Sequence, residues 1–173
     1  MRLKSLAGAA ALLAVLPLTS HADEPGAPRG DRAEAAAAGE PLVIDIPGER
    51  DATVAIEITS MEEVGELLRI GVTFTPEWET EPFGGRDADL AQTLGANLAN
   101  RVTARLIDPV NLLEYQQAAG GTGGQRVPMS AGTPRTVYFY FGLPVEEMET
   151  FDLYLDAAQV GLPPLVDIPY RVE

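Results

Sequence analysis

Five carboxylates lie close together in one short stretch, and they are the residues with the clearest potential for chemistry. They are Glu77, Glu79, Glu81, Asp87 and Asp89, in the acidic, proline-containing segment 76–90. Calcium needs several oxygen ligands from a flexible loop, so a calcium site is one interpretation. The spacing matches no compact calcium motif such as an EF-hand loop. We favour a solvated acidic loop, and we expect no other cofactor.

The side chains that most enzymes use as nucleophiles and metal ligands are nearly absent. The chain has no cysteine, its single histidine is His21, and its single lysine is Lys4. If the N-terminal segment is removed, a Ser-His-Asp triad, a Cys-His pair, a lysine Schiff base and a His/Cys zinc site are all excluded. A hydrolase would then need two carboxylates placed across a cleft. We therefore expect a protein without enzyme activity.

Aromatic side chains are the candidates for contact with a partner. Tyr138, Tyr140 and Tyr154 fall at polar-face positions of "TVYFYF" and "FDLYLD". If these strands are neighbours, the three rings share one outward face and could stack a sugar or dock a protein. We favour the other interpretation, ordinary cross-strand aromatic pairing on a sheet surface. Trp78, the single tryptophan, is either an exposed anchor or a plug at one end of the domain, and we favour the plug.

The stretch "VTARLIDPVNLLEYQ" at 102–116 combines strand and turn chemistry. Asp108 can accept hydrogen bonds from backbone N–H groups two residues on, Pro109 fixes φ, and Asn111 tolerates a left-handed backbone. A strand then resumes through Tyr115. We interpret the stretch as a structural turn that makes a hairpin or a corner between sheets. A calcium site is the alternative, although two oxygen side chains are too few for it.

Alternation of apolar and polar residues predicts that strands position these side chains. Period-two runs follow one another after Pro41, separated by turn segments such as "GGTGG" at 120–124 and "SAGTP" at 130–134. Seven or eight short strands of this kind predict an all-β, immunoglobulin-like antiparallel sandwich over residues 41–173. The sets expected to face the core are Val54, Ile56 and Ile58; Leu68, Ile70, Val72 and Phe74; Val102, Ala104 and Leu106; Val137, Phe139 and Phe141; Phe151, Leu153 and Leu155; and Val166, Ile168, Tyr170 and Val172.

One segment departs from the strand pattern. In "DADLAQTLGANLAN", residues 87–100, Leu90, Leu94 and Leu98 recur every four residues. That spacing favours a helix, although Gly95 weakens it. We expect a short helix or a long ordered loop that crosses between the sheets, and long connections of this kind often carry function.

The second half of the chain resembles a known family. The segments "RLIDPVNLLEYQ", "VPMSAGTPRTVYFYFGLPVEEMETFDLYL" and "PPLVDIPYRV" are similar to exported bacterial, actinobacterial-type immunoglobulin-like domains of unknown function. Some of those domains precede OmpA-type peptidoglycan-binding domains. The resemblance implies the sandwich fold and says little about activity. The matching residues are Leu106, Asp108, Pro109, Asn111, Tyr115, Gly132, Phe141, Pro144, Ile168 and Pro169.

The N-terminus has the pattern of a secretory signal peptide. Residues 1–22 combine a basic start, an apolar run and the small-residue cleavage pattern "SHA". An uncleaved anchor is the alternative, but the run is short for a membrane span. Residues 23–40 predict a disordered Ala/Pro/Gly-rich spacer, in which "AEAAAA" could form one helical turn. We expect cleavage after Ala22 and a secreted or periplasmic protein of the cell envelope.

The charge of the chain excludes some partners. Cleavage would remove Arg2 and Lys4 and no acidic residue, so the net charge would change from −14 to −16. Such a chain repels nucleic acid and anionic lipid, and we expect no stable membrane insertion after cleavage. The acidity reflects either a salty environment or a GC-rich genome, and we favour the second.

A non-catalytic binding domain is therefore the function that the sequence favours. Its partner would be an unknown exported protein or a component of the cell envelope. The first alternative is a calcium-dependent adhesion or stability module that uses the 76–90 loop, and the second is a carboxylate-based hydrolase.

Overall fold

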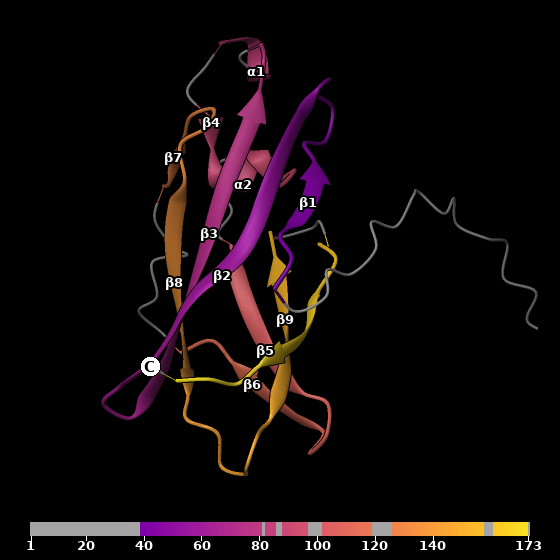
Figure 1. Ribbon diagram of the computed structural model, residues 1–173. Coiled ribbons are helices and arrows are strands. Elements are labelled where there is room, and N and C mark those ends of the chain that lie inside the picture. The colour runs from indigo at the N-terminus through magenta and orange to yellow at the C-terminus, as the bar shows by residue number, and fades with distance from the viewer. Residues whose placement is uncertain are drawn as a thin grey trace, which may run out of the picture. The chain divides into compact units, whose positions relative to one another are not determined.

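The computed structural model describes residues 39–80, 82–85, 88–96, 102–118, 126–157 and 161–172, all within one compact unit that spans residues 32–173 (Figure 1). The predicted signal peptide, residues 1–22, lies outside the described residues, and so does the predicted spacer up to residue 38. Among the helices that the structure describes, none has the length and apolar character needed to cross a membrane.

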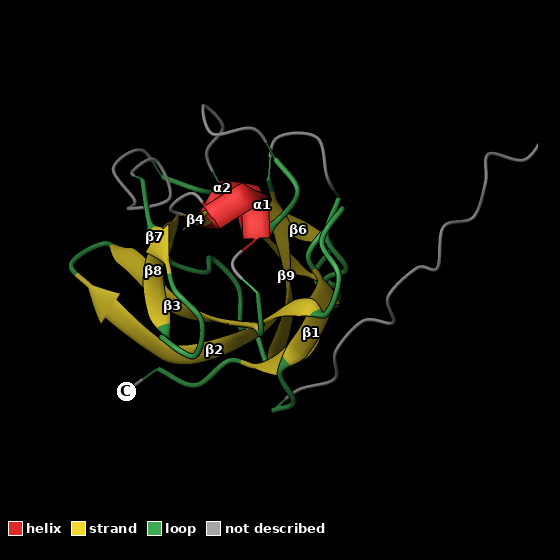
Figure 2. Ribbon diagram, turned by 90° about the horizontal axis from the view of Figure 1, so that it is seen from above, coloured by secondary structure: helices red, strands yellow, loops and turns green. Residues whose placement is uncertain are grey.

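Eight strands form two four-stranded antiparallel sheets. The first sheet has the order β1-β2-β3-β8, with β1 at Leu42–Asp45, β2 at Ala52–Val64, β3 at Leu67–Trp78 and β8 at Arg135–Gly142. The second has the order β10-β9-β5-β6, with β10 at Leu165–Pro169, β9 at Thr150–Asp156, β5 at Thr103–Asp108 and β6 at Leu113–Gln116. Figure 2 shows the two sheets facing each other.

The connectivity is that of a Greek-key sandwich. The chain crosses from one sheet to the other after β3, after β6 and after β8, so β8 returns to pair with β3 and β9 pairs with β5. Two facing antiparallel sheets joined by such crossings are the arrangement of immunoglobulin-like domains. The predicted all-β, immunoglobulin-like antiparallel sandwich is therefore confirmed. The corner at 109–112 is a hairpin within the second sheet and does not change sheets.

Short elements fill the long crossings. β4 (Ala88–Asp89) pairs with β7 (Pro128–Met129) in a two-residue ribbon, and α1 (Pro82–Gly85) and α2 (Leu90–Thr93) lie between β3 and β5. Within α1, Phe83 and Gly84 have positive φ angles of 56° and 69°, so this segment is a kinked turn. Asp89 caps α2 by accepting a hydrogen bond from the N–H of Ala91 at 2.9 Å.

The segment with helical spacing contains only a short helix. Leu90 and Leu94 are buried in the core, as the four-residue spacing predicts. Helix α2 ends at Thr93, and Gly95 follows with a positive φ of 85°. Leu98 and residues 97–100 lie outside the described residues.

The core between the sheets has the alternation that the sequence predicts. Leu68, Ile70, Val72 and Phe74 of β3 are all fully buried, and so are Phe139 and Phe141 of β8. The residues predicted to face inward in and beside β5 and β9 are also buried in this core; they are Val102, Ala104, Leu106, Phe151, Leu153 and Leu155. Each fully buried Leu, Ile or Phe stabilises the fold by about 1.5–3 kcal/mol relative to an exposed one. This core holds together without disulfides, since the chain has no cysteine.

A β-bulge breaks the alternation in two of the predicted strands, and one predicted face is wrong in part. In β2 the pairing with β3 shifts between Ile58 and Ser60. Ile58 is half-buried and packs against the core, as predicted, and Met61 takes the next inward position. In β10 the pairing with β9 shifts between Leu165 and Ile168, and these two residues are buried. Val166, which was predicted to face inward, is half-buried, whereas Ile168, Tyr170 and Val172 belong to the core or pack against it.

Candidate functional site

The three tyrosines predicted to share one patch lie in different sheets. Tyr138 and Tyr140 belong to β8 in the first sheet, whereas Tyr154 belongs to β9 in the second. β8 and β9 follow each other along the chain, but β8 pairs with β3, and β9 pairs with β5 and β10. The outer faces of the two sheets point in opposite directions. The prediction of one aromatic surface is therefore wrong.

On the first sheet, Arg69 of β3 covers the tyrosine pair. Its guanidinium carbon lies 5.1 Å from the centroid of the Tyr138 ring, a cation–π distance. Hydrogen bonds to Glu62 and Tyr140 raise the pKa of Arg69 above its ordinary value. Glu62, Arg69 and Tyr140 are register partners on β2, β3 and β8. This row of contacts is cross-strand pairing within the protein.

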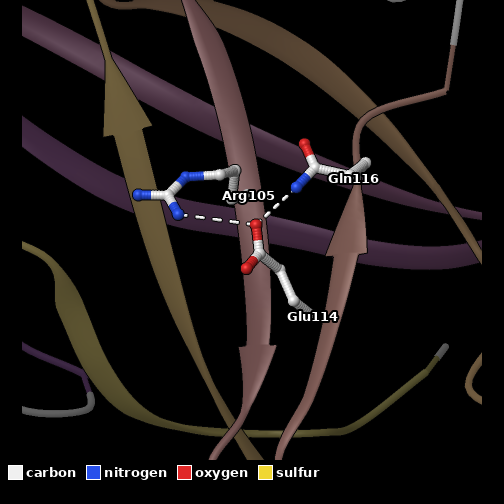
Figure 3. Close-up of polar contacts among 3 residues, drawn as sticks. All are labelled: Arg105, Glu114 and Gln116. Carbon is white, nitrogen blue, oxygen red and sulfur yellow. Dashed lines mark hydrogen bonds and ion pairs between the residues drawn. The ribbon is translucent and has the colours of Figure 1, made fainter.

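The second sheet repeats the arrangement around Tyr154. The guanidinium carbon of Arg105 lies 5.5 Å from the centroid of the Tyr154 ring, and its Nη1 lies 3.4 Å from Oε1 of Glu114. Figure 3 shows the Glu114 carboxylate between Arg105 and Gln116, whose Nε2 also donates to it. In both sheets an arginine guanidinium stacks on a tyrosine ring, and a sugar would need the same kind of ring face.

Trp78 is buried at the end of β3. Its exposed fraction is 9%, and it belongs to the core cluster. Its Nε1–H is also buried and has no hydrogen-bond partner among the described residues. The structure thus favours the interpretation in which Trp78 closes one end of the sandwich over the one in which it is an exposed anchor.

The acidic residues predicted as calcium ligands do not gather in the described part of the chain, where no group of three candidate ligands could hold a metal. Asp89 is buried as the cap of α2, while Glu77 and Glu79 are exposed. Glu79 lines a polar hollow of about 350 Å³ together with Glu49, Arg50 and Asp51. Glu81 and Asp87 lie outside the described residues.

The predicted structural turn is built around Asp108, which is 1% exposed. Its Oδ1 accepts hydrogen bonds from the N–H groups of Val110 at 2.9 Å and Asn111 at 3.0 Å, and its Oδ2 accepts one from Asn111 Nδ2 at 2.8 Å. Burial opposes ionisation of Asp108, but these hydrogen bonds hold the pKa of its carboxyl below the usual range. The left-handed residue of the turn is Leu112, with φ 55°, and not Asn111, whose residue type would tolerate that conformation.

The turn also anchors the neighbouring connection, residues 143–149 between β8 and β9. Nδ2 of Asn111 donates to the carbonyl of Glu147 at 3.0 Å, and the N–H of Val145 donates to the hydroxyl of Tyr115 at 3.3 Å. Pro109 is exposed in the turn. The four residues predicted as turn residues therefore have a structural role, as expected, and two of them position a second loop.

A groove of about 260 Å³ opens where the edges of the two sheets meet. β1 pairs only with residues 53–56 of β2, so residues 57–64 have no strand on that side among those described. β10 is the edge strand of the second sheet. The apolar wall is formed by Ile58, Met61, Leu165 and Ile168, and the rim by Gly39, Glu40, Glu57, Thr59, Ser60, Pro169 and Arg171.

The bulge of β2 lines this groove, and so do Leu165 and Ile168, the two residues that flank the bulge of β10. Hydroxyl contacts hold the bulge of β2, where Thr59 Oγ1 lies 2.9 Å from Thr73 Oγ1. In the bulge of β10, Asp167 has a positive φ of 54°, and its N–H donates to Asp152 Oδ1 at 3.0 Å. Bulges at sheet edges redirect side chains and are common beside binding sites.

The arrangement suits a ligand with an apolar group and polar atoms around it. The wall offers four apolar side chains, and the rim offers Glu40 and Glu57 against Arg171. A pocket of this kind fixes an apolar anchor and orients it through a few polar contacts. Glu40 and Glu57 are the two carboxylates among the residues that line this groove.

Sequence reasoning missed the groove entirely. Gly39 and Glu40 fall at the end of the predicted spacer, and no residue of β2 or β10 was singled out for binding. The sequence did contain an indication of the bulge. Apolar residues recur every two residues up to Ile58, but the next one, Met61, comes three residues later. A phase slip inside a long strand is the mark of a bulge.

No protein-family model matches the chain, and neither a curated protein nor a solved structure shows significant similarity to it.

Proposed function

We propose that the protein is an exported, non-catalytic binding domain, and that the groove between β2 and β10 receives an apolar side chain of an exported protein or cell-envelope component. The groove is the single observation that carries this proposal. The other candidate surfaces are occupied by the protein's own side chains, as at Tyr138 and Tyr154, or are buried, as at Trp78.

The size and lining of the groove favour one anchor side chain. Ligand pockets for whole drug-sized molecules span roughly 300–1,000 Å³, and this groove, at about 260 Å³, is smaller. Protein interfaces concentrate their binding energy on one or a few anchors that fill such pockets. An apolar anchor flanked by backbone amides would place its N–H and C=O groups against the rim residues.

Export is supported by residues 1–22, and it is tested separately from binding. The full chain should be expressed with its own N-terminus in an actinobacterial host, and the exported product should be sequenced from its N-terminus. The expected first residue is Asp23. A product that stays with the cells and begins at Met1 would instead indicate an uncleaved anchor.

Binding is tested with the N-acetyl amides of leucine, phenylalanine and serine, added to the isotope-labelled exported chain in an NMR titration. The leucine and phenylalanine amides should shift the methyl signals of Ile58, Met61 and Ile168 at millimolar concentration, and the serine amide should not. Ile58→Asp should abolish the shifts, whereas Val43→Asp, on an exposed position of β1 outside the groove, should retain them. If the leucine amide shifted the signals of Ile58→Asp as much as those of Val43→Asp, the groove would not be the binding site.

The same samples test the hydrolase alternative for amide bonds. If the amides remain intact over days, binding is not followed by cleavage. If they are hydrolysed, Glu40→Gln and Glu57→Gln identify whether the two rim carboxylates are responsible.

A further inference from the structure

Three large apolar side chains project into solvent at one end of the sandwich, far along the strands from Trp78. Val110 and Leu112 lie in the hairpin turn between β5 and β6, and Val145 lies in the connection between β8 and β9; their exposed fractions are 74%, 86% and 76%. They are the three most exposed large apolar residues among those described. We call them the loop-end triad. Both loops lie at the same end of the sandwich (Figure 1). Ile107 lies just before the hairpin turn, and its register partner Asp152 lies just after the connection between β8 and β9.

The triad is fixed in place by hydrogen bonds. Asp108 holds the N–H groups of Val110 and Asn111. Asn111 reaches the carbonyl of Glu147, and Tyr115 holds the N–H of Val145. On the other side of the loop, the N–H of Tyr170 donates to the carbonyl of Glu149 at 2.8 Å. Loops that are already ordered lose less conformational entropy on binding.

The backbone strain at Leu112 is not offset by burial of its side chain. Its φ of 55° lies in the left-handed region, which is strained for leucine and mild for asparagine or glycine. Its side chain is 86% exposed, so no burial offsets the strain. Strained residues that persist without a packing reason point to function.

The surroundings of the triad are acidic. Glu146, Glu147 and Glu149 lie in the connection between β8 and β9, and Glu66 lies in the turn between β2 and β3 at the same end. Glu114, beside the hairpin turn, is already paired with Arg105. No lysine or arginine occurs in 109–118 or in 143–149. This charge would repel an anionic membrane and, with a net charge of −14, a second copy of the chain.

We propose that the loop-end triad docks into an apolar recess on a basic protein surface, at a site separate from the groove. The apolar side chains fill the recess, and the glutamates around them meet lysines and arginines of the partner. Charge complementarity of this kind accelerates association and discriminates against other partners.

The probe is a displayed library of twelve-residue peptides, selected on the immobilised exported chain. The selected peptides should carry net positive charge around leucine, phenylalanine or tryptophan. Their affinity should fall at least tenfold for the triple variant Val110→Ser, Leu112→Asn, Val145→Ser. It should stay unchanged for Val43→Ser, which alters an apolar residue that is 55% exposed on β1. Raising the salt concentration tenfold should also weaken binding.

The single variant Leu112→Asn distinguishes a loss of binding from a loss of stability. It should raise the melting temperature, because it relieves the left-handed strain, and it should lower the affinity for the selected peptides. Selected peptides that are neutral or acidic, or that bind the triple variant equally well, would overturn the proposal. So would triad-dependent binding to phosphatidylcholine vesicles, which would identify a membrane, or a triad-dependent dimer in sedimentation, which would identify a second copy.

Discussion

Asp108 shows how one buried side chain holds a hairpin turn and, through Asn111, contacts the neighbouring connection. It is buried, it accepts three hydrogen bonds, and through Asn111 it reaches the connection between β8 and β9. The sequence predicted its turn role from the Asp-Pro-x-Asn pattern. It did not predict the contact with Glu147, because that contact depends on which loops the fold brings together.

Replacing Asp108 with asparagine should destabilise the protein in a pH-dependent way. Asparagine keeps an acceptor for the N–H groups of Val110 and Asn111 but places a second donor against Asn111 Nδ2. The cost at pH 7 should be about 1–3 kcal/mol. Because the folded-state pKa of Asp108 is lowered, its ionised form stabilises the fold above the unfolded-state pKa of about 3.9 and this contribution is lost as the pH falls through the folded-state value.

Urea unfolding at pH 7 and at low pH checks this prediction. The difference in unfolding free energy between the wild type and Asp108→Asn should shrink at the lower pH. The exposed Asp45→Asn is the control and should show little difference at either pH. A constant deficit for Asp108→Asn across the range would show that the charge of Asp108 has no part in its effect.

Gly71 is a second residue whose environment dictates its identity. A Cβ at this position would lie 2.3 Å from Ser60 Oγ and 3.2 Å from Tyr138 Cε1. Gly71→Ala should therefore lower the unfolding free energy by about 1–3 kcal/mol. Ser60→Ala in the same chain should recover part of the loss. Gly142→Ala in β8, where a Cβ has no neighbour within 4 Å, should be close to neutral, and an equal effect at both glycines in thermal unfolding would contradict the steric explanation.

At the scale of the strands, alternation predicted which side chains face the core but not which strands are neighbours. The faces of β3, β5, β8 and β9 follow from a period of two, which any half-buried strand obeys. The pairing of β8 with β3 follows from the chain crossing between sheets, which leaves no local pattern. Tyr154 was therefore assigned to the wrong surface, although each tyrosine was placed correctly on an outer face.

The bulge of β2 offers a test at this scale. Ile58 pairs with Val72 and Ser60 with Gly71, so Thr59 is the extra residue, and its deletion would keep the remaining pairs in register. The variant should retain its β-rich circular dichroism spectrum while the groove narrows. The NMR shifts with the leucine amide should disappear. Thr59→Ala, which keeps the bulge and loses only the hydroxyl, should still bind, and binding by the deletion variant would mean that the bulge does not shape the site.

At the scale of the whole molecule, the excess of acidic residues sets the response to ions. With 26 acidic and 12 basic residues, the folded chain is destabilised by its own repulsion. The melting temperature should rise between about 0.05 M and 0.5 M NaCl, because added salt screens this repulsion. Calcium chloride at matched ionic strength should have the same effect, since the described carboxylates form no cluster of three. A rise specific to calcium would favour the alternative in which Glu81 and Asp87 complete a site with the described acidic residues.

The buried indole at the end of β3 makes the protein its own optical reporter. Trp78 is the single tryptophan, it is shielded from solvent, and it lies at the opposite end from Leu112. Since the chain contains no cysteine, a cysteine introduced at position 112 would be a unique attachment point for an acceptor dye. Energy transfer from Trp78, excited at wavelengths that the five tyrosines do not absorb, would then report opening of the sandwich between its two ends.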